Sequence, residues 1–265
     1  MQLKFYFLFL LGCALMQPAV GQINFLGKPG VMTTPSASWE EEEQLGLSFS
    51  YIPSENSRDV FNFRNSLDRS DLNFYNLRIG LTTFLEIGLS LGHRPDLPRS
   101  GGIGERHLDF RLKILNERKF WPSIVVGITP PGSVAPVIAH DFLVATKNFK
   151  TNVGNINVTT GYGSPFVFIR QPDQGFFDIT VIEKKDYYDS QYLTGFFASI
   201  IYSPVDFAGV MVEYNTNTVN AGAYIKLWDW LHLQGYTFEG KKAAFQIAGH
   251  FPLDFSPFAL RKHKK

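Results

Sequence analysis

Histidine, serine and aspartate side chains gather around two predicted loops, and these are the residue types of a hydrolytic triad. His93 and His107 flank a loop that contains Ser100. His140 and Asp141 follow a proline-rich loop. A serine nucleophile, a histidine base and an aspartate that orients the base could then form a triad at one rim of the molecule. We favour the plainer interpretation that these are polar residues at loop bases, and we predict no catalytic residue.

Motifs for cofactors, metals and modification are weak. Gly101-Gly102-Ile103-Gly104 is rich in glycine, but no helix pattern follows it, so it indicates a flexible loop rather than a phosphate cradle. Asn157-Val158-Thr159 spells a glycosylation sequon but lies inside a predicted strand. No spacing typical of a metal site occurs in the sequence. We therefore expect no cofactor and no metal.

β-Strands must position these side chains, because apolar and polar residues alternate along the chain with a period of two. Residues 108–114 put Leu, Phe, Leu and Ile on one face and Asp, Arg and Lys on the other. No long apolar run follows Gly21, which excludes transmembrane helices. The prediction is an all-β fold with about twelve strands. They lie near 44–52, 72–81, 84–93, 106–115, 122–129, 139–147, 154–162, 193–202, 207–214, 219–227, 230–237 and 243–251.

Connections between these strands distinguish a membrane barrel from a soluble β-sandwich. Those after the second, fourth, sixth, eighth and tenth strands are tight, whereas most others are long, and the longest, 163–192, is predicted to be a loop. A sandwich also alternates, but it seldom supplies aromatic residues at every second turn. We therefore predict an antiparallel transmembrane β-barrel with both chain ends on the tight-turn side. Its interfacial aromatic girdle would be Phe84, Phe120, Trp121, Phe149, Phe207, Trp228 and Trp230.

The polar faces of these strands carry ionisable residues that would line the barrel lumen. Three charges on one strand face, as at Asp109, Arg111 and Lys113, need water. Such a wall could be a polar conduit or a sugar-binding surface. It could also be a mutually neutralising network that plugs a narrow pore, and the similar numbers of both signs favour this second interpretation. The predicted lumen residues are Arg78, Glu86, Asp109, Arg111, Lys113, Lys147, Glu213, Lys226 and His232.

The N-terminal 21 residues are predicted to be a secretory signal peptide. They hold one basic residue, Lys4, no acid, and an apolar run that is too short to span a membrane, and they end in Ala19-Val20-Gly21, which suits cleavage. An alternative is lipoprotein processing at Leu10-Leu11-Gly12-Cys13, which would leave Cys13 lipidated. The remaining parts are a periplasmic or lumenal segment at 22–43, a barrel at 44–255 and a basic tail at 256–265.

Charge and cysteine content exclude further classes. Without Lys4, 24 Lys and Arg balance 24 Asp and Glu, so the mature chain has no basic excess for nucleic acid. Cys13 is the only cysteine, so the mature chain has no disulfide and no thiol nucleophile. A secreted chain without cysteine suits the envelope of a Gram-negative bacterium.

Short motifs across most of the mature chain carry a family resemblance. Residues 27–37, GKPGVMTTPSA, precede an acidic run and a first strand, and residues 77–88, LRIGLTTFLEIG, form a predicted hairpin. Together with 109–115, 122–127, 145–147, 213–215 and 220–222, they resemble YjbH-like outer-membrane proteins. The resemblance implies a non-enzymatic outer-membrane β-barrel associated with making or exporting exopolysaccharide. Its implied partners are outer-membrane lipid, polysaccharide and proteins of export or biosynthesis.

Two other functions remain open from the sequence, a porin-like channel for small solutes and an outer-membrane barrel hydrolase. The aromatic residues of 163–192 do not separate the alternatives, because they would serve either carbohydrate contact or a loop folded into the barrel.

Overall fold

A closed antiparallel barrel of twelve strands dominates the computed structural model, which confirms the predicted fold class. The structure describes residues 22–39, 44–53, 71–95, 105–133, 138–170, 175, 178–187, 192–228 and 230–253. The predicted signal peptide and basic tail lie outside these residues. The barrel strands are β1 (Gln44–Ile52), β2 (Leu72–Gly80), β3 (Leu85–His93), β4 (Glu105–Leu115), β5 (Ser123–Ile128), β6 (Phe142–Thr151), β7 (Gly154–Gly163), β10 (Gly195–Val205), β11 (Ala208–Tyr214), β12 (Val219–Leu227), β13 (Leu231–Phe238) and β14 (Lys242–Pro252).

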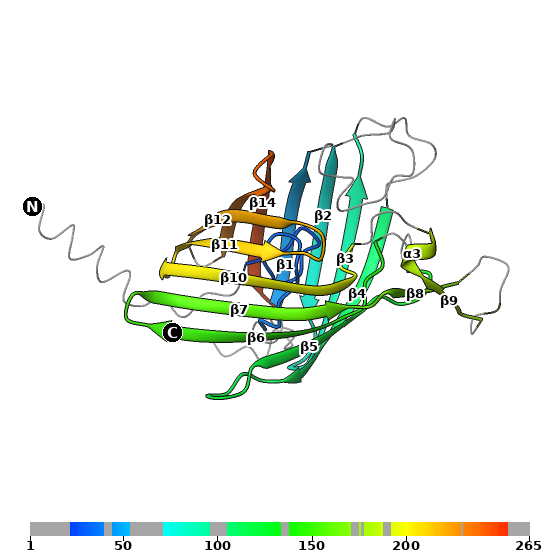
Figure 1. Ribbon diagram of the computed structural model, residues 1–265, viewed down its shortest axis with the longest axis horizontal. Coiled ribbons are helices and arrows are strands. Elements are labelled where there is room, and N and C mark those ends of the chain that lie inside the picture. The colour runs from blue at the N-terminus through cyan, green and yellow to red at the C-terminus, as the bar shows by residue number, and fades with distance from the viewer. Residues whose placement is uncertain are drawn as a thin grey trace, which may run out of the picture.

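Strand β1 closes the barrel by pairing with β2 on one side and β14 on the other (Figure 1). Leu47 of β1 lies opposite both Leu77 of β2 and Gly249 of β14. The other neighbours follow chain order, except that β7 pairs directly with β10. Closure leaves the barrel without an open strand edge, so the ladder pairs its backbone groups within the protein.

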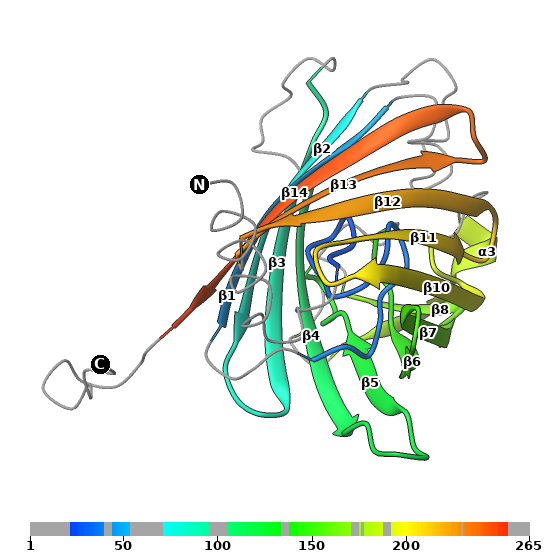
Figure 2. The ribbon, with the colours of Figure 1, turned by 90° about the vertical axis from the view of Figure 1, so that its left-hand side faces the viewer.

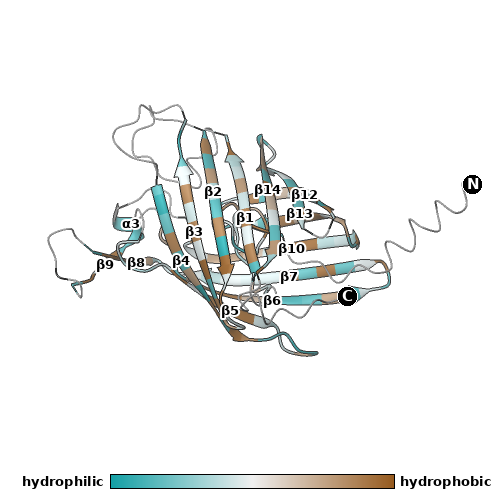
Figure 3. Cartoon of the chain, turned by 180° about the vertical axis from the view of Figure 1, so that it is seen from behind, coloured by the Kyte–Doolittle hydropathy of each residue, from teal (hydrophilic) through white to brown (hydrophobic). Residues whose placement is uncertain are grey.

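Side chains alternate between the lumen and the outer surface, with the polar ones inside. In β4, His107, Asp109 and Arg111 are buried in the lumen, whereas Leu108 and Phe110 lie on the other face. Hydrophobic and hydrophilic residues accordingly alternate along the strands (Figure 3). The wall also turns apolar side chains inward, among them Phe74, Val125 and Phe197, so the outer face is apolar while the interior is mixed.

The short connections predicted from the sequence gather at one end of the barrel. They are residues 81–84, 116–122, 152–153, 206–207 and 228–230, although β6 continues to Thr151 and shortens the turn predicted at 148–153. All seven aromatic residues predicted for the girdle lie at or beside these turns and are exposed. Trp228 and Trp230 stack there with ring centroids 5.9 Å apart. We call this the short-turn end.

The stretch 163–192 differs from the predicted loop, because it contains a hairpin and a helical turn. Strand β8 (Phe166–Ile169) pairs with β9 (Thr180–Glu183), and α3 (Lys184–Tyr187) follows. Val167 and Ile182 lie opposite each other and are buried with Ala139, so the hairpin packs beside the start of β6 (Figure 1). The four-residue strands were too short for the alternation to reveal.

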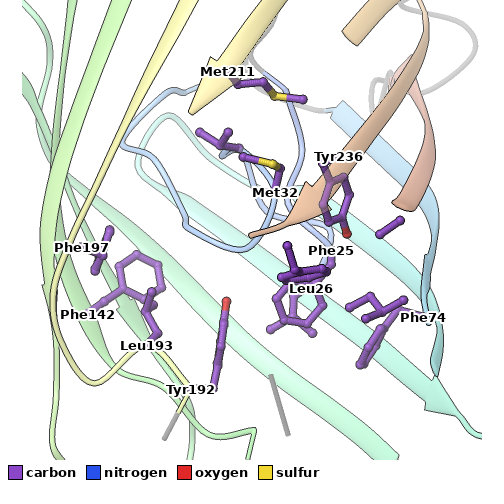
Figure 4. Packing of buried hydrophobic residues seen from close by; sticks show 14 of the residues in the cluster. Phe25, Leu26, Met32, Phe74, Phe142, Tyr192, Leu193, Phe197, Met211 and Tyr236 are labelled. Carbon is purple, nitrogen blue, oxygen red and sulfur yellow. The ribbon is translucent and has the colours of Figure 1, made fainter. Parts of the chain in front are cut away.

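The barrel encloses a second piece of the chain, residues 22–39, which we call the lumenal segment. Every residue from Gln22 to Ala37 is buried, and Figure 2 shows the segment as a dark blue coil inside the barrel. Its Phe25, Leu26 and Met32 pack with wall residues that include Phe74 and Tyr192 (Figure 4). Among the described residues, no helix is long and apolar enough to cross a membrane.

Candidate functional site: a lumen filled by the lumenal segment

The first half of the lumenal segment forms a tight turn that its own residues stabilise. Asn24 Oδ1 accepts hydrogen bonds from the backbone N–H groups of Leu26 (3.1 Å) and Lys28 (3.0 Å). Asparagine commonly stabilises a turn in this way. Gly27 has a φ of +75°, and a Cβ atom there would lie 2.5 Å from Cβ of Asn76 in β2. Glycine is therefore required both for the backbone conformation and for the close approach to the wall.

The second half folds back along the first. Ile23 bridges to Pro29 and Gly30 bridges to Pro35, and the N–H of Phe25 donates to the carbonyl of Met32 at 2.9 Å. Proline lacks the N–H that a continuous ladder needs, so the two passes do not become regular strands. The segment thus satisfies part of its backbone internally, and the remaining polar groups need partners on the wall.

Glu213 of β11 binds three consecutive backbone N–H groups of the lumenal segment. Its Oε2 accepts from Met32 at 3.2 Å and from Thr33 and Thr34 at 3.0 Å each. The hydroxyl groups of both threonines also donate to this carboxylate, and Asn220 Nδ2 donates at 2.9 Å. Glu213 therefore holds the middle of the segment through several hydrogen bonds at once.

The carbonyl groups of the segment are bound by donors from several strands of the wall and by Tyr192, which lies shortly before β10. Gln234 of β13 and Gln246 of β14 also hydrogen-bond to each other, which orders both amides. Buried carbonyl groups rarely lack such donors, because an unpaired one costs free energy. The contacts are Gln234 to Ile23 (2.8 Å), Gln246 to Asn24 (2.8 Å), Asn76 to Phe25 (3.0 Å), Ser90 to Leu26 (3.1 Å), Tyr192 to Thr33 (2.6 Å) and Arg111 to Ser36 (2.9 Å) and Ser38 (3.0 Å).

One buried ion pair joins the segment to the wall. Lys28 Nζ lies 2.9 Å from Asp109 Oδ2, which is also 3.3 Å from His107 Nε2. The His107 ring stacks on His140 at 5.1 Å. Burial lowers the pKa of Lys28 below its usual value, while the nearby Asp109 charge opposes that shift. Burial, followed by the charge of Lys28, lowers the pKa of His140 well below its usual range, so His140 is a neutral ring.

A second charged network lies on β2, β3 and β4. Glu86 is placed between two arginines, with Oε1 3.0 Å from Arg78 Nη1 and Oε2 bonded to Arg111 Nη1. Strand pairing places Glu86 directly opposite Arg111, which brings these side chains together. Arg78 Nη2 also lies 3.3 Å from His250 Nδ1. The Glu86 carboxylate is thus the shared counter-charge of both arginines, and such a partner is what a buried charge requires.

Trp39, the last residue of the lumenal segment, contacts two cationic side chains of β4. The Arg111 guanidinium carbon lies 5.3 Å from the centre of the Trp39 ring, and Lys113 Nζ lies 4.9 Å from it. Cation–π contacts of this kind stabilise an aromatic ring beside positively charged side chains. Arg111 therefore binds both the backbone and a side chain of the segment.

The structure places most of the predicted lumen residues on the inner face. Arg78, Glu86, Asp109, Arg111, Glu213, Lys226 and His232 are buried there, and Lys113 is partly buried. Lys147 differs, because the buried residue of β6 is Thr146, and alternation puts Lys147 on the outer face with Leu143. It pairs with Glu117 at 2.9 Å, beside a short turn. The prediction for Lys147 assigned the phase of this strand incorrectly.

Uncharged residues do much of the binding and were not among the predicted site residues. Gln234 and Gln246 lie on inward positions of their strands, and the alternation pattern could have identified them. Tyr192 lies in a connection, where no strand pattern points to it.

The residues considered for a hydrolytic triad do not form one in the described structure. His107 and His140 do meet, but Asp141 accepts the Thr129 N–H at 2.7 Å and His93 ends β3. Ser100 lies outside the described residues. Within the part of the chain that the structure describes, no group of three or more His, Cys, Asp and Glu residues could hold a metal ion.

Comparison with known proteins gives one family. Residues 22–265 match the family model YjbH, described as exopolysaccharide biosynthesis protein YbjH. The match includes the lumenal segment as well as the barrel. A search of curated proteins gave no match.

Proposed function

Because the chain belongs to the YjbH family of exopolysaccharide biosynthesis proteins, we propose that it is a non-enzymatic β-barrel of the Gram-negative outer membrane that serves exopolysaccharide production or export. An N-terminal signal peptide would direct it there. The partners would be outer-membrane lipid, the polysaccharide and proteins that make or export it.

The apolar outer face of the barrel, together with the charged side chains buried inside, carries this proposal. Leu89, Ile200 and Val212 expose about half of their surfaces on the outer face, at 46%, 52% and 49%, while Arg111 and Glu213 inside are 1% exposed. An apolar surface of this extent is unfavourable in water and matches the hydrocarbon of a bilayer. The aromatic residues at the short-turn end would then lie at a membrane interface, where their rings are favoured.

Both chain ends support an orientation in which the short-turn end faces the periplasm. The lumenal segment leads into β1 at this end, and β14 finishes there. Barrels of the outer membrane place short turns in the periplasm and longer loops outside. Connections such as 94–104 and 164–194 would therefore be extracellular.

The filled lumen argues against an open porin-like channel. The backbone of the lumenal segment is bound by side chains from β2, β3, β4, β11, β13 and β14. Burying Phe25, Leu26, Val31 and Met32 contributes about 1.5–3 kcal/mol each, so the segment stays in place in the resting protein. The buried carboxylates Glu86, Asp109 and Glu213 are engaged by arginines, by Lys28 and by the segment backbone, which supports a role without catalysis.

Deleting the gene in a strain that makes exopolysaccharide tests the proposal. We expect the deletion to reduce polymer output and a plasmid copy to restore it. The restored protein should fractionate with the outer membrane and migrate faster on a gel without boiling, because closed barrels resist detergent. Unchanged polymer output, or recovery of the protein in the soluble periplasm, would refute the proposal.

A further inference from the structure

The inner wall recognises the lumenal segment mainly through its backbone oxygens. Gln234, Gln246, Asn76 and Ser90 each donate to a carbonyl group, and none of these contacts depends on a side chain of the segment. Donors arranged in this way bind a chain of closely spaced oxygen atoms. We propose that this wall is a saccharide-binding path, which the lumenal segment occupies in the closed barrel and a hydroxylated polysaccharide occupies when the segment withdraws. The inference rests on the proposed function in exopolysaccharide export.

The barrel wall is complete without the lumenal segment. The β-bridges described for the segment, Ile23 to Pro29 and Gly30 to Pro35, are internal to it. Strand β1 already has β2 and β14 as its neighbours. The segment leads into β1 at the short-turn end, so it can leave towards that side without breaking a strand pair.

The segment also keeps internal contacts that allow it to move as a folded unit. Its turn is held by Asn24, and the N–H groups of Gly30 and Ser36 donate to the carbonyls of Gln22 (2.7 Å) and Pro29 (2.8 Å). Withdrawal would therefore exchange contacts with the wall while these internal hydrogen bonds remain.

Buried hydroxyl groups in the wall provide an independent indication of a polar ligand. Tyr236 Oη, Ser199 Oγ and Ser50 Oγ have no hydrogen-bond partner among the described protein atoms. Tyr236 lies beside Phe25 and Met32 of the segment (Figure 4). A buried hydroxyl without a partner costs free energy, and sugar hydroxyl groups, which both donate and accept, would satisfy these positions.

The charges of the wall favour a hydroxylated polymer over a strongly charged one. Arg78 and Arg111 both pair with Glu86, while Asp109 and Glu213 would lose their contacts with the segment. Both signs thus line the path, and water entering with the polymer would hydrate them. Exposure of Phe25, Leu26 and Met32 opposes withdrawal, so opening has to be coupled to polymer or to an export partner.

Accessibility of Ser90 reports whether the segment leaves. The mature chain has no cysteine of its own if the signal peptide is removed, so Ser90→Cys would carry the only thiol. Ser90 is 1% exposed and lies under Leu26. A thiol reagent too polar to cross lipid should label it in cells that export polymer and leave it unlabelled in cells whose polymer synthesis is blocked. Asn217→Cys, in an exposed turn, should be labelled in both, and lipid-facing Val212→Cys in neither.

A disulfide that locks the segment tests whether withdrawal is required. Ser90 Oγ lies 3.1 Å from the Leu26 carbonyl oxygen, so residues 26 and 90 are neighbours, and a disulfide between cysteines at these positions is checked by gel mobility with and without a reductant. In the double variant Leu26→Cys/Ser90→Cys, we expect loss of polymer output when the disulfide forms and recovery after a reductant is added. The same double variant kept reduced, at equal protein abundance, is the matched control and sets the output against which the oxidised form is compared.

Normal output from the fully oxidised double variant would overturn the inference, as would absence of Ser90→Cys labelling during export. The labelling result stands even where the disulfide fails to form. A gene deletion that leaves polymer output unchanged would instead refute the proposed function. Loss of output on deletion combined with normal output from the locked barrel would refute only the saccharide path.

Discussion

Lys28 of the lumenal segment and Asp109 of β4 form an ion pair of 2.9 Å in which each side chain is 2% exposed. Lys28 lies in an irregular segment, whereas Asp109 lies in the strand with the most regular alternation. Their contact joins the segment to the barrel at a point where both charges are shielded from water. Removing one partner leaves the other charge buried and uncompensated, which costs more than the pair contributes.

Lys28→Met should therefore destabilise the barrel by about 3–5 kcal/mol, because Asp109 loses its main counter-charge. Thermal unfolding of the protein in detergent, followed by circular dichroism, measures this effect. The double variant Lys28→Met/Asp109→Leu is the matched control and should recover much of the loss. A double variant as unstable as the single one would show that the ion pair is not the cause.

Phe110→Arg should impair assembly, because Phe110 lies on the outer face of β4 between two lumenal residues. An arginine facing the bilayer interior of a barrel costs about 2–4 kcal/mol. The fraction of heat-modifiable protein in outer-membrane extracts should fall, while Phe110→Leu should keep the level of the parent. Equal assembly of both variants would contradict a lipid-facing position for residue 110.

The stability of the barrel should decrease in mild acid because of His140. Burial lowers the pKa of this ring in the folded protein, whereas an unfolded histidine has a pKa of about 6.5. Below a pH of about 6.5 the unfolded chain binds more protons than the folded one. Stability therefore falls as the pH drops from about 6.5 towards the lower pKa of His140 in the folded protein. His140→Phe keeps an aromatic ring in the stack but cannot take up a proton. The unfolding temperature of this variant should therefore depend less on pH between about 7 and about 5. An unchanged slope in the variant would exclude His140 as a source.

The orientation of the barrel predicts which connections an antibody can reach. An epitope tag at Gly132, between β5 and β6, should be detected on intact cells, and one at Asp206, between β10 and β11, only after permeabilisation. Both residues are exposed, so a difference between them reports the side of the membrane rather than burial. The reverse pattern would invert the proposed topology.

Much of the barrel could be predicted from the sequence because each strand carries its own signal. Residues 108–114 alternate apolar and charged side chains, and such a pattern indicates a strand with one face in apolar surroundings and the other in polar surroundings. The same local signal located the short turns and the aromatic residues beside them. It failed where it is weak: at Lys147, where the phase of β6 is ambiguous, and in the short strands β8 and β9.

The closed lumen was decided only by tertiary structure. Thr33 and Glu213 are 180 residues apart, and no local pattern relates a carboxylate on β11 to backbone N–H groups near the start of the chain. The segment around Gly27 and Pro29 has no periodicity, since its conformation comes from an asparagine turn and from donors supplied by several strands. Alternation in the sequence determined which side chains face the lumen. What fills that lumen depends on contacts that exist only after the barrel has closed, because only closure brings the donors around a single irregular segment.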